Sequence, residues 1–326
     1  MSWWSGSKLV GRRPFALAGG VAVLALLMAP SVRASAATGT FKTIDVPGAA
    51  GTLLAGIDED NVIAVNYTGS AGGQFGALYR NGTFTPVNDP AAGSGPGQGT
   101  SPITPKDTGD DTNVLRSTTV IGWYVDSANM YHGFVYRSGK FTNFDDPSAG
   151  TGSFHGTIAY DMTSTGTILG EFIDATGVTH GFLDHNGHFT TVDNPSAGTA
   201  SGQGTVLDGV NSNGVFVGTY TDSSDVTHGF SLHNGTYTVL NDPSAGSAAF
   251  QGTFTFEINR GGLIVGTYTD SVNVNHGMTY MGGVFTTLDD PNGTMGTTAQ
   301  GVSDGGRIVG DYHDSGNVDH GYIYTP

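Results

Sequence analysis

The stretch Gly218-Thr219-Tyr220-Thr221-Asp222, followed after five residues by His228-Gly229-Phe230, decides the fold of this chain. Successive copies of its histidine are 48, 48, 48 and 44 residues apart. A constant period of this size is typical of proteins that stack copies of one supersecondary unit. The Asp and His of the motif recur as five pairs: Asp126 and His132, Asp174 and His180, Asp222 and His228, Asp270 and His276, Asp314 and His320.

One repeat unit contains four short alternating runs that are separated by turn residues. The runs cover residues 204–211, 215–222, 228–232 and 236–240. The last two are joined by Asn234-Gly235, a strong hairpin signal because both residues tolerate positive φ. Four antiparallel strands in about 48 residues match one blade of a β-propeller.

The two ends of the chain indicate how many blades there are. The third strand of the unit occurs six times, first around Phe75 and last around His320. A lone fourth strand, residues 40–45, opens the sequence, and the chain stops just after a third strand. We therefore predict an all-β, six-bladed propeller with four-stranded antiparallel blades, closed by the N-terminal strand pairing with the C-terminal blade, which hides both edges. The connections between blades and the loops between strands two and three then share one face, where propellers usually bind.

The first 36 residues predict an export signal. A basic start (Lys8, Arg12, Arg13) precedes an uncharged apolar run over 15–28 and the small-residue site Ala34-Ser35-Ala36. This is the pattern of a secretory signal peptide, and residues 11–17 also resemble a twin-arginine signal. An uncleaved anchor is the alternative, although the apolar run is shorter than the ~20 residues needed to span a membrane. We expect residues 37–326 to form one domain of a secreted or periplasmic protein.

Charge and cysteine content narrow the possible partners. The sequence has 28 acidic and 12 basic residues, and four of the basic ones lie in the expected signal, which leaves a net charge of about −20. Such a charge favours a soluble monomer and argues against nucleic acid, or a membrane after signal cleavage, as the partner. There is no cysteine. An exported protein without disulfides depends on its packed core.

The five Asp–His pairs have two interpretations. They could serve as metal ligands or acid–base groups, or each pair could be a structural contact across one turn. The first unit has Gly69 in place of Asp and Phe75 in place of His, so both members are missing together. Loss as a pair favours the structural interpretation, and we expect no metal at these pairs.

The repeat resembles a known family in its glycine-rich strand and the His-Gly that follows. The stretch Asn259-Arg260-Gly261-Gly262-Leu263-Ile264-Val265-Gly266-Thr267-Tyr268, with His276-Gly277 after it, is similar to the HAF-type extracellular repeat. The likeness covers nearly all of the chain after residue 37. It implies an exported bacterial repeat protein and brings no established activity with it.

Positions at which the repeats differ are the candidates for a site. Asp161, Glu171 and Glu257 are predicted to line the central tunnel, where they could act on a glycan, hold Ca²⁺ with carbonyl oxygens or simply be solvated. No other cofactor is expected. Four polar residues stand directly before Gly-Thr on the predicted binding face, where they suit hydrogen bonding to a ligand or to the loop backbone: Gln98, His155, Gln203 and Gln251. Trp123 is a further candidate binding residue.

The second unit is nine residues longer than the others between Thr100 and Trp123. The extra segment contains Pro102, Pro105, Lys106 and Asp110-Asp111. Proline and charge in such an insertion predict a surface loop.

These observations favour a secreted, non-catalytic binding or scaffold propeller that engages a glycan, protein or surface polymer through its loop-rich face. The sequence contains no Gly-x-Ser-x-Gly, His-Glu-x-x-His, phosphate-loop or dinucleotide motif. The alternative is an extracellular polysaccharide hydrolase or lyase with carboxylates at the central tunnel. A purely structural envelope protein is a third possibility.

Overall fold

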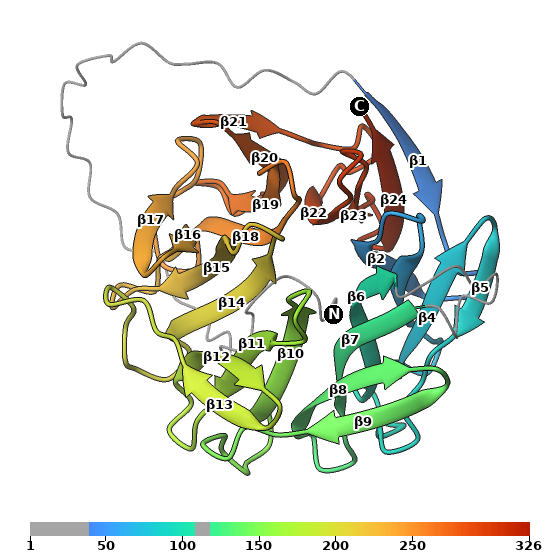
Figure 1. Cartoon of the computed structure of the whole chain (residues 1–326). Coiled ribbons are helices and arrows are strands. Elements are labelled where there is room, and N and C mark those ends of the chain that lie inside the picture. Colours follow the sequence, from blue (N-terminus) through green and yellow to red (C-terminus); the bar gives the residue numbers. More distant parts are fainter. Residues whose placement is uncertain (1–38, 108–117) are drawn as a thin grey trace, which may run out of the picture.

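The computed structural model describes residues 39–107 and 118–326 and is built from strands around a central axis (Figure 1). The expected signal peptide and Asp110-Asp111 lie outside the described residues. Within the described ranges no helix is present that is long and apolar enough to cross a membrane.

Six four-stranded sheets follow one another around the ring, as the repeat predicts. Blade one consists of β2 (Gly51–Ile57), β3 (Ile63–Thr68), β4 (Gln74–Arg80) and β5 (Thr83–Pro86). Blade two consists of β6 (Gly99–Asp107), β7 (Thr118–Val125), β8 (Tyr131–Arg137) and β9 (Lys140–Phe144). Blade three consists of β10 (Gly156–Met162), β11 (Ile168–Ile173), β12 (Thr179–His185) and β13 (His188–Thr191). Blade four consists of β14 (Gly204–Val210), β15 (Phe216–Thr221), β16 (Thr227–His233) and β17 (Thr236–Leu240). Blade five consists of β18 (Gly252–Ile258), β19 (Ile264–Thr269), β20 (Asn275–Met281) and β21 (Val284–Thr287). Blade six consists of β22 (Gly296–Val302), β23 (Ile308–His313), β24 (Asp319–Thr325) and β1 (Thr40–Ile44).

The sixth blade confirms the predicted closure. The N-terminal β1 pairs antiparallel with β24, from Thr40 opposite Thr325 to Ile44 opposite Gly321. Figure 1 shows β1 (blue) along the outer edge of β24 (red), so the two ends of the chain complete one sheet. Phe41 packs on Tyr322 and Tyr324 at ring-centroid distances of 5.1 and 4.9 Å. Backbone pairing and aromatic packing therefore both hold the ring shut.

The apolar residue after His-Gly fills the space between blades. Phe134, Phe182, Phe230 and Tyr322 are fully buried, and Met278 takes the same position in blade five. Neighbouring sheets thus pack face to face through one large side chain in each of blades two to six, while blade one has the small Ala77 at this position. The strict period of the sequence follows from this wedge-shaped contact.

Every innermost strand contains a β-bulge near its middle. The register of each inner strand with its neighbour shifts by one residue at Ala55, Ile103, Tyr160, Asp208, Phe256 and Gln300. A bulge turns a side chain away from the regular alternation. All six bulged residues line the central cavity.

The connections divide between two faces, in agreement with the predicted polarity. We call the face with the blade-to-blade connections and the loops between second and third strands the loop face. The turn face carries the turns between first and second strands and the Asn-Gly hairpins between third and fourth strands. The Asp–His motif therefore belongs to the loop face.

The prediction of a surface loop over Pro102, Pro105 and Lys106 is wrong, because all three residues lie in β6. Pro102 is opposite Gly122, and Lys106 is opposite Thr119 in β7. An innermost strand pairs along its length with one neighbour only, and proline is tolerated on such an edge strand because no second ladder needs its N–H. Part of the insertion therefore lengthens a hairpin and places Lys106 near the axis.

Candidate functional site

Each of the five Asp–His pairs lies across one loop of the loop face. His Nε2 is 3.2–3.6 Å from a carboxylate oxygen of the motif Asp in every pair. The Asp also holds its own turn: Asp222 Oδ1 accepts hydrogen bonds from the N–H groups of Ser224 and Val226. The pair therefore ties the end of the second strand to the start of the third.

The histidine has a second partner that the motif does not contain. Nδ1 of His276 lies 2.8 Å from Asp289 Oδ2, on the fourth strand side of the same blade. The equivalent partners are Asp145, Asp193, Asn241 and Asp45. Each ring also stacks on the aromatic residue of the second strand, as His276 does on Tyr268 at 4.8 Å. These contacts involve the whole imidazole and support the structural interpretation.

In the pair of Asp270 and His276, the contacts favour the charged form of both side chains. The hydrogen bond with Asp289 is the main cause that raises the pKa of His276, against the opposing effect of partial burial. For Asp270, partial burial would raise the pKa, but the N–H groups of Val274 and Val272 and the nearby His276 outweigh it and lower the pKa. Blade one lacks the pair and instead stacks Phe75 on Tyr67 at 5.4 Å.

Replacing His276 with alanine should lower the free energy of unfolding by about 1–2 kcal/mol, because two hydrogen bonds and a ring contact are lost. The pKa of His276 is raised in the folded protein. This stabilisation is therefore complete below the ordinary pKa of about 6.5 and disappears as the pH rises through the raised value. Urea unfolding at pH 6 and pH 9 measures both effects. His276→Phe, which installs the residue of blade one, should lose less free energy of unfolding than His276→Ala. If His276→Ala lost equal amounts at pH 6 and pH 9, the pKa argument would be contradicted.

The four polar residues before Gly-Thr hold the loops of the loop face. Gln251 Oε1 accepts from Ala248 N–H, and its Nε2 donates to Asn273 Oδ1. Gln203 bonds Ala200 and Asp225 in the same way, and Gln98 bonds Gly95 and Asn129. His155 Nδ1 is 3.0 Å from Ser153 O. These polar groups form hydrogen bonds within the loops. A role of the four residues in ligand binding stays a prediction.

Trp123 lies between blades two and three and is half-buried. It packs edge-on against Tyr131 at 5.5 Å and against the buried cluster that contains Val125, Ile158 and Ile173. Its indole N–H is buried and has no hydrogen-bond partner among the described residues. This placement makes Trp123 part of the packing between blades.

The central cavity is small and acidic. Its volume is about 50 Å³, and the residues that line it besides the bulged ones include the carboxylates Glu171 and Glu257. Tyr160 donates a 2.9 Å hydrogen bond to Glu171. Burial raises the pKa of Glu171 to about 7, against the opposing effect of that bond. Burial, with Glu171 nearby, also raises the pKa of Asp208, a tunnel carboxylate that sequence reasoning missed because the bulge shifts the alternation by one residue.

Asp161 and Glu257 bridge neighbouring inner strands. Asp161 is almost fully buried, accepts from Val210 N–H of the next blade, and pairs with Lys106 Nζ at 2.8 Å. Glu257 accepts from Val302 N–H, again one blade further on. Burial raises the pKa of Glu257 to about 8, although Lys106 lowers it in part. The two carboxylates thus use their oxygens on backbone groups that the packing would otherwise leave unsatisfied.

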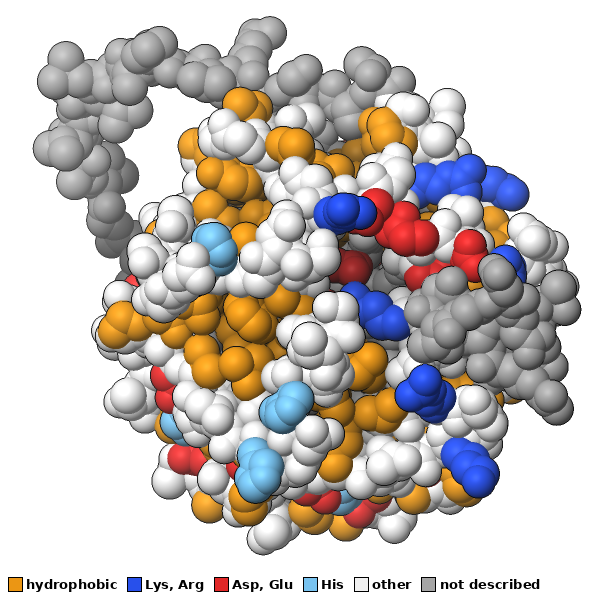
Figure 2. All heavy atoms as spheres, viewed as in Figure 1, with side chains coloured by type: hydrophobic (Ala, Val, Ile, Leu, Met, Phe, Trp, Pro, Cys, Tyr) orange, Lys and Arg blue, Asp and Glu red, His pale blue; other side chains and the backbone are white. Residues whose placement is uncertain are grey.

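The tunnel opens on the turn face into a funnel of about 500 Å³, which Figure 2 shows as a hollow where acidic and basic side chains meet. Every carboxylate that lines it accepts a backbone N–H: Asp58 from Val62, Glu59 from Asp304, Glu257 from Val302 and Asp304 from Arg260. Basic residues also belong to this face, at or beside its turns: Arg80, Arg137, Lys140, Arg260 and Arg307. The fold therefore separates these basic groups from the Asp-rich loop face.

Two phenylalanines on the loop face stand in a strained backbone conformation. Phe250 has φ 67° and is 54% exposed, and Phe154 has φ 61° and is 38% exposed. The corresponding residues of blades two and four are Gly97 and Gly202, which adopt positive φ without a steric cost. All four donate the same backbone hydrogen bond to the preceding blade, as Phe250 does to Asp225 O at 2.7 Å. A bulky residue at positive φ costs about 1–2 kcal/mol.

Comparison with known proteins supports the architecture. No protein-family model matches the chain, and no curated protein matches it in sequence. A fungal lectin from Aleuria aurantia, described as a six-bladed β-propeller with a novel fucose recognition mode, is similar with a TM-score of 0.51 at 12% identity, over 86% of this chain and 93% of the lectin. A protein of unknown function from Dyadobacter fermentans has a TM-score of 0.48 at 9% identity, over 86% of this chain and 99% of its own. At such identities the likeness to the lectin shows the fold alone, and this chain is a six-bladed β-propeller.

Proposed function

We propose that the protein is an exported, non-catalytic propeller that binds a neutral glycan through its loop face. The observation that carries the proposal is Phe250, an aromatic ring held exposed at positive φ where another blade uses glycine. Strained residues persist where they serve a purpose other than stability. An exposed ring among amide and carboxylate groups suits a sugar, whose apolar face packs on the ring while its hydroxyls form hydrogen bonds.

The charge of the loop face supports a neutral ligand. The motif aspartates and their partners on the fourth strands line this face, whereas the basic residues belong mostly to the turn face. A polyanionic polysaccharide would be repelled by this arrangement. Neutral hydroxyls, in contrast, can donate hydrogen bonds to the carboxylates.

The enzyme alternative has weaker support. Glycosidic catalysis needs two carboxyl groups roughly 5–10 Å apart on either side of the bond. Asp161 is buried against Lys106, and Glu171 lies in a cavity of about 50 Å³, which is too small for a sugar ring. Of the three predicted carboxylates, only Glu257 lines the funnel.

Export and family membership belong to the same proposal. They rest on the signal pattern in residues 8–36 and on the resemblance of the repeat to the HAF type. A binding protein of this kind would act at or beyond the cell surface. The protein recovered after export should therefore have the mass of a chain that begins at Ala37.

A glycan array, followed by calorimetry on the best ligand, tests the proposal with Phe250→Asn. Asparagine tolerates positive φ and already occupies such positions at Asn129 and Asn273. The free energy of unfolding should stay level or rise by up to about 1 kcal/mol. Affinity should fall about tenfold, since a lost ring contact of about 1.4 kcal/mol has that effect.

Val284→Ser is the matched control. Val284 is an exposed apolar residue beside a turn-face hairpin, so its replacement should leave glycan affinity unchanged. Equal affinity of the parent and Phe250→Asn would reject the proposed site. Binding to proteins with no response to any glycan would reject the ligand class.

A further inference from the structure

Blade six differs from the other blades at three positions next to the loop face. These are the residue before the aromatic of the second strand, the last residue of that strand, and the residue opposite the latter on the third strand. In blade six they are Asp311, His313 and Asp319. Blade five has Thr267, Thr269 and Asn275, and blade four has Thr219, Thr221 and Thr227. Only the last blade brings two carboxylates and an imidazole together at these positions.

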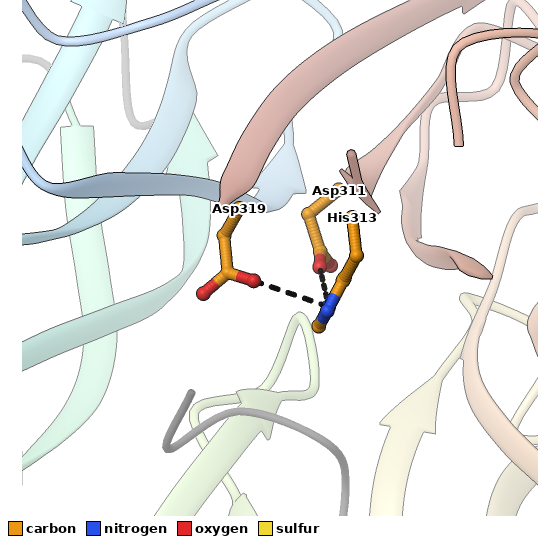
Figure 3. A group of neighbouring side chains, drawn as sticks. All are labelled: Asp311, His313 and Asp319. Carbon is orange, nitrogen blue, oxygen red and sulfur yellow. Dashed lines mark hydrogen bonds and ion pairs between the residues drawn. The ribbon is translucent and has the colours of Figure 1, made fainter. Parts of the chain in front are cut away.

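The three side chains converge on one point (Figure 3). His313 Nε2 lies 3.2 Å from Asp311 Oδ2 and 3.2 Å from Asp319 Oδ1, and the three atoms all lie within 4.8 Å of one another. Two ligands about 2.1 Å from one ion are about 3.0–3.4 Å apart at octahedral or tetrahedral angles. The two nitrogen–oxygen distances therefore already match the edges of a coordination polyhedron.

A hydrogen-bond network explains this cluster less well than an ion does. Asp311 Oδ2 is placed for a hydrogen bond with His313 Nε2, whereas Asp319 Oδ1 is buried and receives no hydrogen bond from the described residues. One nitrogen carries at most one proton, so it cannot satisfy two carboxylates at once. With a neutral imidazole the cluster holds two negative charges, and the side chains of Asp311 and His313 are only 1% and 13% exposed.

The Asp–His pairs of the repeat provide an internal contrast. In those pairs the two carboxylates face opposite ring nitrogens, as Asp270 faces Nε2 and Asp289 faces Nδ1 of His276. No single ion can contact both carboxylates and the ring in that arrangement. In blade six both carboxylates face the same nitrogen.

Outer contacts orient Asp311. Thr298 on the inner strand of the same blade donates its hydroxyl to Asp311 Oδ1, and Gln300 Nε2 donates to Thr298 at 3.1 Å. This leaves Oδ2 directed at His313. Hydrogen-bonded support of this kind is usual behind metal-binding carboxylates. Asp319, 21% exposed, leaves a side open to solvent through which an ion can enter.

We propose that Asp311, His313 and Asp319 form a site for one divalent transition-metal ion, with Zn²⁺ the best fit. One imidazole and two carboxylates are ligands that Zn²⁺ accepts, with solvent at the remaining position. Ca²⁺ fits less well, because it takes six to eight oxygen ligands. The site is independent of the glycan proposal.

The test uses the full chain without a polyhistidine tag, freed of metal with EDTA and titrated with ZnCl₂ by calorimetry. One Zn²⁺ per chain should bind, and Zn²⁺ should raise the melting temperature because it binds the folded state only. Co²⁺ in place of Zn²⁺ should give visible d–d absorption that reports the coordination geometry. The variant Asp311→Thr, His313→Thr, Asp319→Asn installs the residues of blade five, so it should fold, and it should show neither binding nor the thermal shift.

His276→Ala is the matched control, because it removes a histidine that also has two acidic neighbours. Its Zn²⁺ binding should equal that of the parent. Equal binding by the parent and the triple variant would overturn the proposal, as would the absence of saturable Zn²⁺ binding by the parent. A thermal shift with Ca²⁺ alone would overturn the choice of metal class.

Discussion

Gly252→Ala should destabilise the protein by about 4 kcal/mol or prevent it from folding, a large share of the 5–15 kcal/mol typical of whole proteins. Gly252 begins the inner strand of blade five and has φ 130°. A Cβ there would lie 1.9 Å from Thr227 O and 2.7 Å from Thr227 C. These are backbone atoms of the preceding blade, so no side-chain movement relieves the clash.

The position of Gly252 explains the size of the effect. Gly252 pairs in parallel with Thr227, and Thr227 N–H donates to Gln251 O. This contact joins the third strand of blade four to the inner strand of blade five at the loop face. Separating the blades to admit a methyl group would also disturb the buried aromatic contacts between them.

Gly235→Ala is the control for the backbone conformation alone. Gly235 has φ 76° in a hairpin turn, and a Cβ there would meet no atom within 4 Å. Its cost should be about 1 kcal/mol, from the left-handed conformation only. Denaturant unfolding of both variants measures the difference, and similar losses would show that the contact between blades is not the cause.

Glu171→Gln should make the protein more stable than the parent at pH 8, by up to about 3 kcal/mol. Glu171 is buried in the central cavity, and burial raises its pKa from 4.5 to about 7. The folded state therefore holds a proton that the unfolded chain releases between these values. Stability falls as the pH rises through this window and levels off above it. Glutamine carries no charge and still accepts the hydrogen bond of Tyr160.

Urea unfolding at pH 4, 6 and 8 checks this sign. The parent and Glu171→Gln should differ little at pH 4, and the advantage of the variant should grow towards pH 8. Asp60→Asn, at a side chain that is half exposed, is the control and should shift stability little at any of these pH values. Parallel stability curves for the parent and Glu171→Gln would contradict the argument.

Local patterns in the sequence were enough to predict the strands and their order. The strand alternation, the Asn234-Gly235 turn and the period of the histidines each depend on neighbouring residues, so the four-stranded blade could be predicted without a structure. The closing strand could also be predicted, because an unpaired fourth strand at one end complements a blade that lacks one at the other.

The candidate site residues were harder to predict, since each depends on small departures from the repeat. A one-residue bulge puts Tyr160 in the cavity lining where Asp161 was expected, and the equivalent bulge in blade four adds Asp208. The alternation of apolar and polar residues in a sequence cannot reveal where such a bulge lies. The cluster in blade six did leave a signal, because Asp311-x-His313 puts two possible ligands on one face of a strand. Its third member, Asp319, comes from the neighbouring strand and follows only from the register.

The sequence by itself determined the class of fold, the number of blades and the closure, because a repeated unit can bury its apolar faces only against copies of itself. The tertiary structure decided which side chains meet. It gave the histidine of each Asp–His pair a second partner, which lies 13 residues away in four blades and at the other end of the chain in blade six. It also separated basic residues from the Asp-rich loop face and held Phe250 exposed at positive φ. Those features arise from strand register, bulges and loop backbone angles, which packing between blades sets and which no local pattern records.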